Sequence, residues 1–141
     1  MRKYNLSGRV RFIGESTSSV LDKLYDGSSL FVLPSHYEGY GIALTEAAAR
    51  GLPIVSTTGG AIPDTIPSEV GVLVPPADHD ALAKALGLLL SHDSENSPDS
   101  GKSGLAKLAK ASRDHAMSLP DWSQAARQFA NAVLDLTVDG I

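Results

Sequence analysis

Two glutamates, Glu38 and Glu46, lie eight positions apart around a short glycine-rich stretch, Gly39-Tyr40-Gly41. An apolar run precedes the stretch and a helical pattern follows it. We therefore expect it at the carboxyl end of a strand, where open α/β sheets bind their ligands. Glycines let a bulky group approach the backbone closely, and the amides at the start of a helix attract anions. These residues predict a phosphate site between two carboxylates.

The two carboxylates suit the groups that would flank such a phosphate. An ionised carboxylate only accepts hydrogen bonds, so Glu46, about a turn and a half inside the helix, could hold the two neighbouring hydroxyls of a ribose. Glu38 precedes the helix and could hold hydroxyls of the group that the phosphate carries. This order fits a nucleotide sugar. On spacing alone, an alternative remains that Glu46 is a solvated helix residue and that Gly39 and Gly41 only shape a turn.

The composition argues against several other classes of protein. The 141 residues, 43% of them hydrophobic, suffice for one globular domain. A net charge of −4 without a basic run disfavours binding to nucleic acid or to an anionic membrane. No stretch is as apolar as a signal peptide or a membrane span, so we expect a cytoplasmic protein. There is no cysteine, and no metal or cofactor is expected, because metal-ligand spacing is absent among His36, His79, His92 and His115.

Alternating strand and helix patterns must position these residues. Four short apolar runs, at 10–13, 29–33, 53–56 and 70–74, predict strands that are covered on both faces. Helical patterns separate or follow them, at 18–27, from Gly41 to Arg50 and at 78–92. The order predicts an α/β fold, a Rossmann-like open parallel sheet of about four strands with flanking helices.

The rest of the chain predicts a loop and C-terminal helices. Residues 1–93 are expected to form the nucleotide-sugar-binding core, and the polar, turn-rich residues 94–104 an exposed loop. Residues 105–141 are expected to form helices at 105–118 and 122–136 that pack on the core or on a partner. The apolar face of the second helix comprises Trp122, Ala125, Ala126, Phe129, Val133 and Leu134.

The segment from about Val10 to Leu90, which includes PSHYEGYGIALTEAAARGLPIV, resembles the C-terminal, donor-binding domain of the retaining glycosyltransferases of family 4, which have the GT-B fold. The resemblance implies that Glu46 binds the ribose hydroxyls, and that Glu38 contacts the transferred sugar and serves as the catalytic glutamate. It also implies that Gly59 and Gly60 close the pocket, although a plain flexible turn is an equal alternative. Further implied donor contacts are the loop Gly39, Tyr40 and Gly41 at the sugar and pyrophosphate, Ile42 beside the nucleotide, and Gly14, Glu15 and Ser16 at the base.

The same resemblance implies parts that this sequence lacks, so we expect a chain that is truncated on its N-terminal side. Members of the family present an Arg and a Lys to the diphosphate, and none of Lys3, Arg11, Lys23 and Arg50 matches those positions. The acceptor-binding N-terminal domain would come from elsewhere, as a domain or a partner subunit. Without the central strands of the family sheet, residues 10–13 must pair beside 29–33 or leave an exposed edge, so a rearranged four-stranded sheet or a homo-oligomer is expected.

Three functions stay open. The chain could be the donor-binding part of an enzyme that transfers a hexose from a nucleoside-diphosphate sugar, such as a UDP-hexose, and that is inactive in isolation. It could instead be a non-catalytic nucleotide-sugar-binding subunit, or an interaction domain with a vestigial site. Retention of Glu38, Gly41 and Glu46 favours real binding. A glycosidase pair ranks lower because the glycine loop favours phosphate, and Ser35 has no base that would make it a nucleophile.

Overall fold

The computed structural model describes residues 6, 8–91 and 101–138. Its centre is a parallel sheet with the strand order β1-β2-β3. The strands are β1 (Phe31–Leu33), β2 (Ile54–Thr57) and β3 (Gly71–Val74). Phe31 pairs with Ile54 and Ile54 with Gly71, so the carboxyl ends of all three strands lie at the same edge. The α/β fold with a parallel sheet is confirmed, with three strands in place of the four expected.

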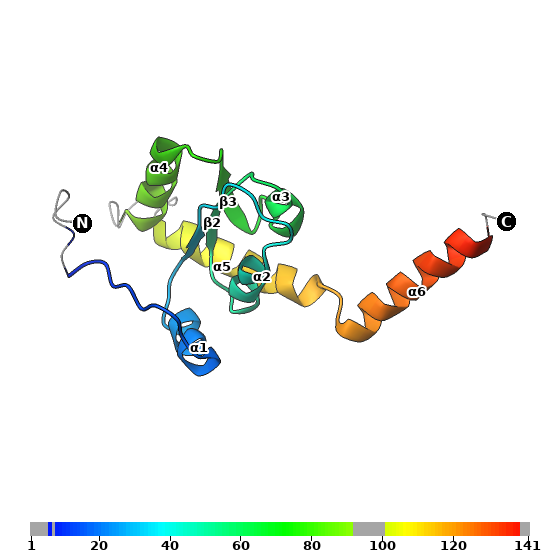
Figure 1. Ribbon diagram of the computed structural model, residues 1–141. Coiled ribbons are helices and arrows are strands. Elements are labelled where there is room, and N and C mark those ends of the chain that lie inside the picture. The colour runs from blue at the N-terminus through cyan, green and yellow to red at the C-terminus, as the bar shows by residue number, and fades with distance from the viewer. Residues whose placement is uncertain (1–5, 7, 92–100, 139–141) are drawn as a thin grey trace.

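Helices cover both faces of this sheet (Figure 1). On one face, α2 (Ile42–Ala49), the short α3 (Ile62–Thr65) and α5 (Gly101–Ser118) pack over an apolar cluster, and on the other α4 (His79–Leu90) packs over a second cluster. Because β2 faces a cluster on each side, all of its residues are buried, which explains its continuous apolar sequence. The first cluster comprises Leu44, Ala47, Ala48, Leu52, Ile54, Ile62, Ile66 and Val70, and the second Val55, Val74 and Ala85.

The ends of two helices follow local signals in the sequence. Gly51 follows the last turn of α2 with φ of 69°, a left-handed conformation that glycine adopts without steric cost. Asp78 caps α4, because its Oδ1 accepts a hydrogen bond from the amide of Ala81 at 2.8 Å. The first of these ends precedes the start of β2, and the second follows the end of β3.

The helix α5 is tied to the core by polar atoms. Ser112 is fully buried, and its hydroxyl donates to the carbonyl oxygen of Leu52 at 2.8 Å. Nε2 of His115 lies 3.0 Å from the carbonyl oxygen of Thr65. α5 begins at Gly101, so residues 101–104 are helical and not part of the expected loop. Residues 94–100 of that loop lie outside the described part of the chain.

The last helix, α6 (Trp122–Val138), points away from the sheet, as the orange and red ribbon in Figure 1 shows. Its predicted apolar face is largely exposed to solvent, with Trp122 92% and Phe129 72% exposed. The core of the domain therefore does not cover these two side chains. Among the described helices, none combines the length and the apolar character that a membrane crossing requires.

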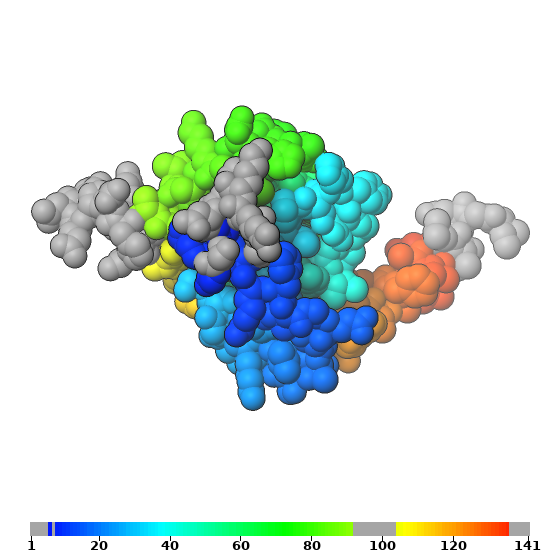
Figure 2. All heavy atoms as spheres, turned by 60° about the vertical axis from the view of Figure 1, so that its left-hand side comes forward, coloured from blue at the N-terminus to red at the C-terminus, as the bar shows by residue number. Residues whose placement is uncertain are grey.

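Residues 10–13 do not form the first predicted strand, and this expectation was wrong. They form an irregular segment before α1 (Ser18–Asp26), and Phe12 is 84% exposed. Figure 2 shows this segment and α1, in blue, at the surface of one face of the molecule. An apolar run becomes a strand only where another strand offers its backbone groups. No described strand pairs with residues 10–13, so the rearranged four-stranded sheet is not formed.

Candidate functional site

The glycine loop lies at the carboxyl edge of the sheet, between β1 and α2, as the sequence predicts. Gly41 has φ of 81°, and a Cβ atom there would lie 2.8 Å from Cδ1 of Leu44, so the fold itself requires glycine. A Cβ atom at Gly39 would meet no heavy atom of the described chain within 4 Å. Packing therefore does not explain the glycine at position 39, which leaves open space beside the backbone for a ligand.

Glu38 is held through both its backbone and its side chain. It forms an isolated parallel bridge with Gly60, and its carbonyl oxygen accepts a hydrogen bond from the amide of Ala61 at 2.9 Å. Oγ of Ser35 donates to Oε1 of Glu38 at 2.7 Å, so this hydroxyl orients the carboxylate. The residue is half-buried. One oxygen of the carboxylate is thereby held, and the other oxygen is able to accept a further hydrogen bond.

Gly59 and Gly60 allow the loop after β2 to meet the loop after β1 backbone to backbone. A Cβ atom at Gly59 would lie 2.3 Å from the carbonyl oxygen of His36, and one at Gly60 would lie 2.2 Å from that of Glu38. No side chain fits at such distances. The two glycines are thus required for this close approach, whereas their role in closing a pocket over a ligand stays a prediction.

Buried hydroxyls bind the same loops, and sequence reasoning missed them. Thr57 donates through Oγ1 to the carbonyl oxygen of Ser35, and Thr65 donates to that of Tyr40 at 2.6 Å. Both threonines are more than nine-tenths buried, and buried polar groups almost always have hydrogen-bond partners. For Thr57 the available signal was a hydroxyl residue at the end of the strand β2. The identity of its partner, more than 20 positions away, was not readable.

Glu46 lies in an open groove of about 320 Å³ between α1 and α2. The OH group of Tyr25 donates to its Oε2 at 3.1 Å. Glu38 is not among the residues that line this groove. It precedes α2, whereas Glu46 lies within that helix. From Gly41 to Glu46 the helix rises about 7.5 Å. The lining residues are Ser18, Leu21, Asp22, Tyr25, Glu46, Ala49 and Arg50.

A cluster of charges and rings joins α1 to α2 beside Glu46. Arg50 forms salt bridges with Asp22 and, at 3.0 Å, with Asp26. Its guanidinium carbon lies 5.6 Å from the centre of the Tyr25 ring, and Phe31 packs against the same ring at 5.8 Å between centroids. The hydrogen bond to Asp22 raises the pKa of Arg50. Arg50 is therefore engaged by two carboxylates.

Burial raises the pKa of Tyr25, and the hydrogen bond to Glu46 and the negative charge of that carboxylate raise it further, while Arg50 opposes the shift. The phenol therefore keeps its proton at neutral pH. It can act only as a hydrogen-bond donor toward a carboxylate.

The remaining predicted donor contacts lie at the surface around these two sites. Ile42 is 66% exposed at the start of α2, and Tyr40 is 57% exposed just before it. Gly14, Glu15 and Ser16 lie in the irregular segment that leads into α1, whose first residue lines the groove of Glu46. The sequence-predicted residues are thus distributed along α2 and the chain before α1.

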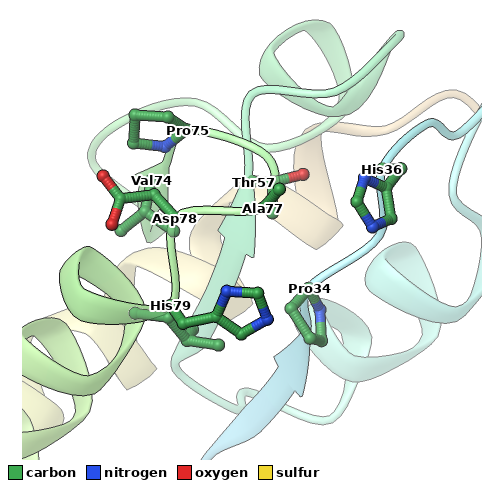
Figure 3. A pocket seen from close by; sticks show the side chains of 9 residues that line it. Pro34, His36, Thr57, Val74, Pro75, Ala77, Asp78 and His79 are labelled. Atoms are coloured by element: carbon green, nitrogen blue, oxygen red, sulfur yellow. The ribbon is translucent and has the colours of Figure 1, made fainter.

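A second, smaller cavity lies at the carboxyl edge of the sheet (Figure 3). It has about 100 Å³, and His36 and His79 approach it from the loop after β1 and from the start of α4. In the described part of the chain, no group of three or more His, Cys, Asp or Glu side chains could hold a metal ion. The cavity is lined by Pro34, His36, Thr57, Val74, Pro75, Ala77, Asp78, His79 and Leu82.

Comparison with known proteins agrees with the geometry. A sequence model of the glycosyl transferases group 1 matches residues 1–104. The D-inositol 3-phosphate glycosyltransferase of Salinispora tropica is 34% identical over 125 residues, which are 88% of this chain and 24% of that protein. The glycogen synthase of Mycobacterium tuberculosis is 33% identical over 134 residues, 94% of this chain and 30% of that protein.

A solved structure extends this likeness to the fold. The sucrose-phosphate synthase of Thermosynechococcus elongatus superimposes with a TM-score of 0.76 at 32% sequence identity. The alignment covers 99% of this chain and 33% of that chain. This chain therefore spans 24% to 33% of the length of these three proteins.

Proposed function

Because this chain belongs to the family of glycosyl transferases group 1, we propose that it is the donor-binding part of a retaining glycosyltransferase. The proposed donor is a nucleoside-diphosphate sugar such as a UDP-hexose. The acceptor and further catalytic groups come from a domain or subunit outside this chain, in line with the much greater length of its relatives. The observation that carries the proposal is the position of Glu46. Its carboxylate is held in a groove on the same helix that begins with the glycine loop.

The donor lies along α2 in this proposal. The ribose hydroxyls bind to Glu46, and the diphosphate accepts hydrogen bonds from amides at the start of the helix, around Gly41 and Ile42. The transferred sugar lies beside Gly39 and Tyr40 and donates hydroxyls to Glu38. Open space at position 39 and the half-buried, oriented carboxylate of Glu38 support this order. The base extends toward Gly14, Glu15 and Ser16.

The chemical step needs little covalent help from these residues. The bond between the anomeric carbon and the diphosphate oxygen breaks, and a bond to the acceptor oxygen forms on the same face of the sugar. The acceptor proton passes to an oxygen of the departing diphosphate. The amides at the start of α2 point at the place where negative charge grows, and they stabilise it without moving.

Calorimetric titration of the chain with UDP, ADP and GDP tests the proposal. We expect one of them to bind, and Glu46→Ala to weaken that binding about tenfold or more, the change that corresponds to losing a hydrogen bond to a charged group. Glu69→Ala is the matched control. It removes an exposed glutamate just before β3, at the opposite edge of the sheet, and should leave the affinity unchanged.

Binding that survives Glu46→Ala would contradict the assignment of the ribose site. If none of the three nucleotides releases heat or shifts the NMR signals of residues 39–46, the donor-binding proposal is wrong. An interaction domain with a vestigial site would then be the remaining function.

A non-catalytic nucleotide-sugar-binding subunit is the second candidate. The pairing of Arg50 with Asp22 and Asp26 favours it, because this cation is already neutralised beside the groove. The two candidates differ in donor hydrolysis. We expect none from the isolated chain, and slow release of sugar by the pure chain would favour the enzyme over the binding subunit.

The partner surface in this proposal is the exposed apolar segment before α1 together with the edge of β1. Val10, Phe12 and Ile13 are exposed there, and so is Val32 in the edge strand β1. An uncovered strand edge with apolar neighbours tends to associate. An acceptor-binding domain or subunit would cover it, and sedimentation velocity of the pure chain would show whether copies of the chain cover it instead.

A further inference from the structure

The groove between α1 and α2 favours hydroxyl groups over phosphate. Its charged lining residues are two acids, Asp22 and Glu46, and one base, Arg50. Arg50 is already bound to Asp22 and also to Asp26. Because these acids outnumber the single base, the net charge at the groove is negative. A phosphate is therefore repelled, whereas a hydroxyl can donate to a carboxylate. Within the proposed donor, the ribose is the part that fits this groove.

Glu46 could not present a fixed acceptor to that ribose by itself. Its side chain is exposed, and an unrestrained glutamate loses considerable rotamer freedom when a ligand orders it. In this structure the OH group of Tyr25 already holds Oε2 at 3.1 Å. The ordering has thus taken place before any ligand arrives, which is the condition for tight binding through few contacts.

Tyr25 is itself well placed to hold the carboxylate. Its ring is in contact with Phe31 on the sheet and with Arg50 at the end of α2. Asp22 and Asp26, from the same helix as Tyr25, hold Arg50 in turn. α1 buries none of its residues, so these contacts are prominent among those that attach it to the domain. The position of the phenol follows from α1 and α2 together.

We propose that Tyr25 is a positioning residue that orients the carboxylate of Glu46 so that it binds ribose selectively. Its hydroxyl donates to Oε2 and thereby directs Oε1 toward the ribose hydroxyls of the donor. The inference rests on the proposed function and adds to it the residue that sets the preference for a ribonucleotide over a 2′-deoxyribonucleotide. The phenol does not touch the reacting atoms.

The experiment compares matched nucleotide pairs: UDP with 2′-deoxy-UDP, ADP with 2′-deoxy-ADP, and GDP with 2′-deoxy-GDP. Calorimetry gives both affinities for the chain, for Tyr25→Phe and for Tyr37→Phe. Tyr37 is the matched control, because it is 75% exposed and lines neither the groove nor the smaller cavity. For the pair that binds, we expect the ribose preference to fall about fivefold in Tyr25→Phe, with the 2′-deoxy affinity nearly unchanged. Tyr37→Phe should keep the preference of the unmodified chain.

A structural role for Tyr25 would have a different signature. A uniform loss of affinity for both nucleotides of a pair, or an unchanged preference, would overturn the inference while leaving the proposed function intact. Failure of the unmodified chain to bind any of the six nucleotides would refute the proposed function and this inference together.

Glu46→Ala removes the acceptor that the Tyr25 hydroxyl holds. In that background Tyr25→Phe should no longer change the ribose preference. A full effect there would show that Tyr25 acts by a route other than Glu46. The NMR signals of residues 18–26 in each variant verify that α1 is still in place.

Discussion

The two walls of the candidate site are built in different ways. The glycine-loop wall (Ser35 and residues 38–41 and 57–65) is held by backbone contacts and by buried hydroxyls, over a fully buried apolar cluster. The α1 wall (residues 18–26) has no buried residue and is attached to α2 largely through exposed salt bridges, a phenol and ring contacts. The comparison teaches that the proposed sugar and diphosphate end of the site rests on the buried core, whereas the proposed ribose end depends on surface contacts.

The largest expected difference between the walls is in the cost of losing an apolar side chain. Leu44 is fully buried under the glycine loop, so Leu44→Ala should lower the free energy of unfolding by about 3 kcal/mol. Leu21 lines the groove on α1 and is 43% exposed, so Leu21→Ala should change the free energy of unfolding by less than about 0.5 kcal/mol. Urea unfolding followed by circular dichroism measures both. Equal losses would show that α1 shares the core.

A smaller effect is expected from adding one carbon where the two loops meet. Gly60 has φ of 63° and no room for a Cβ atom, so Gly60→Ala should destabilise the chain by about 2 kcal/mol. Gly87 in α4 is the matched control, because its Cβ position is open. Gly87→Ala should leave stability unchanged or raise it by up to about 1 kcal/mol. If Gly60→Ala behaved like Gly87→Ala, the loops would not be in backbone contact.

The smallest effect is a pH dependence of stability, which arises from Tyr25 in the α1 wall. The pKa of Tyr25 is raised in the folded chain, so the folded state holds this proton more tightly than the unfolded state. The stabilisation is fully present below the ordinary tyrosine pKa near 10 and is lost as the pH rises through the higher folded value. Tyrosinate absorbance of the chain minus that of Tyr25→Phe should show a transition above pH 10. A transition at or below that pH would contradict the hydrogen bond to Glu46.

Local signals predicted the parts of the fold that depend on neighbours in the sequence. The strands near 29–33, 53–56 and 70–74 were readable because each is a short apolar run that two layers of helices cover. The end of α2 at Gly51 and the cap of α4 at Asp78 were readable because their chemistry lies within one turn. The glycine loop was placed at the correct edge of the sheet for the same reason.

The remaining features depend on contacts between residues far apart in the chain, which local sequence patterns do not predict. Residues 10–13 have the composition of a strand, but a strand also needs an adjacent edge, and no described strand pairs with them. The apolar face of α6 was expected to be covered by the core or by a partner, and the core leaves Trp122 and Phe129 exposed. The bond from Tyr25 to Glu46 joins positions 21 residues apart. Its existence follows from how α1 packs, which no periodicity within α1 encodes.

The ties at the glycine-loop wall have a consequence for the order of folding. Thr57 bonds Ser35 across 22 residues, and Thr65 bonds Tyr40 across 25. Each tie closes a chain segment about as long as a single strand-helix unit, and the entropic cost of closing such a segment grows only slowly with its length. The glycine loop can therefore assemble in the same cooperative step as the central strands, and it should keep its shape while either end of the chain frays.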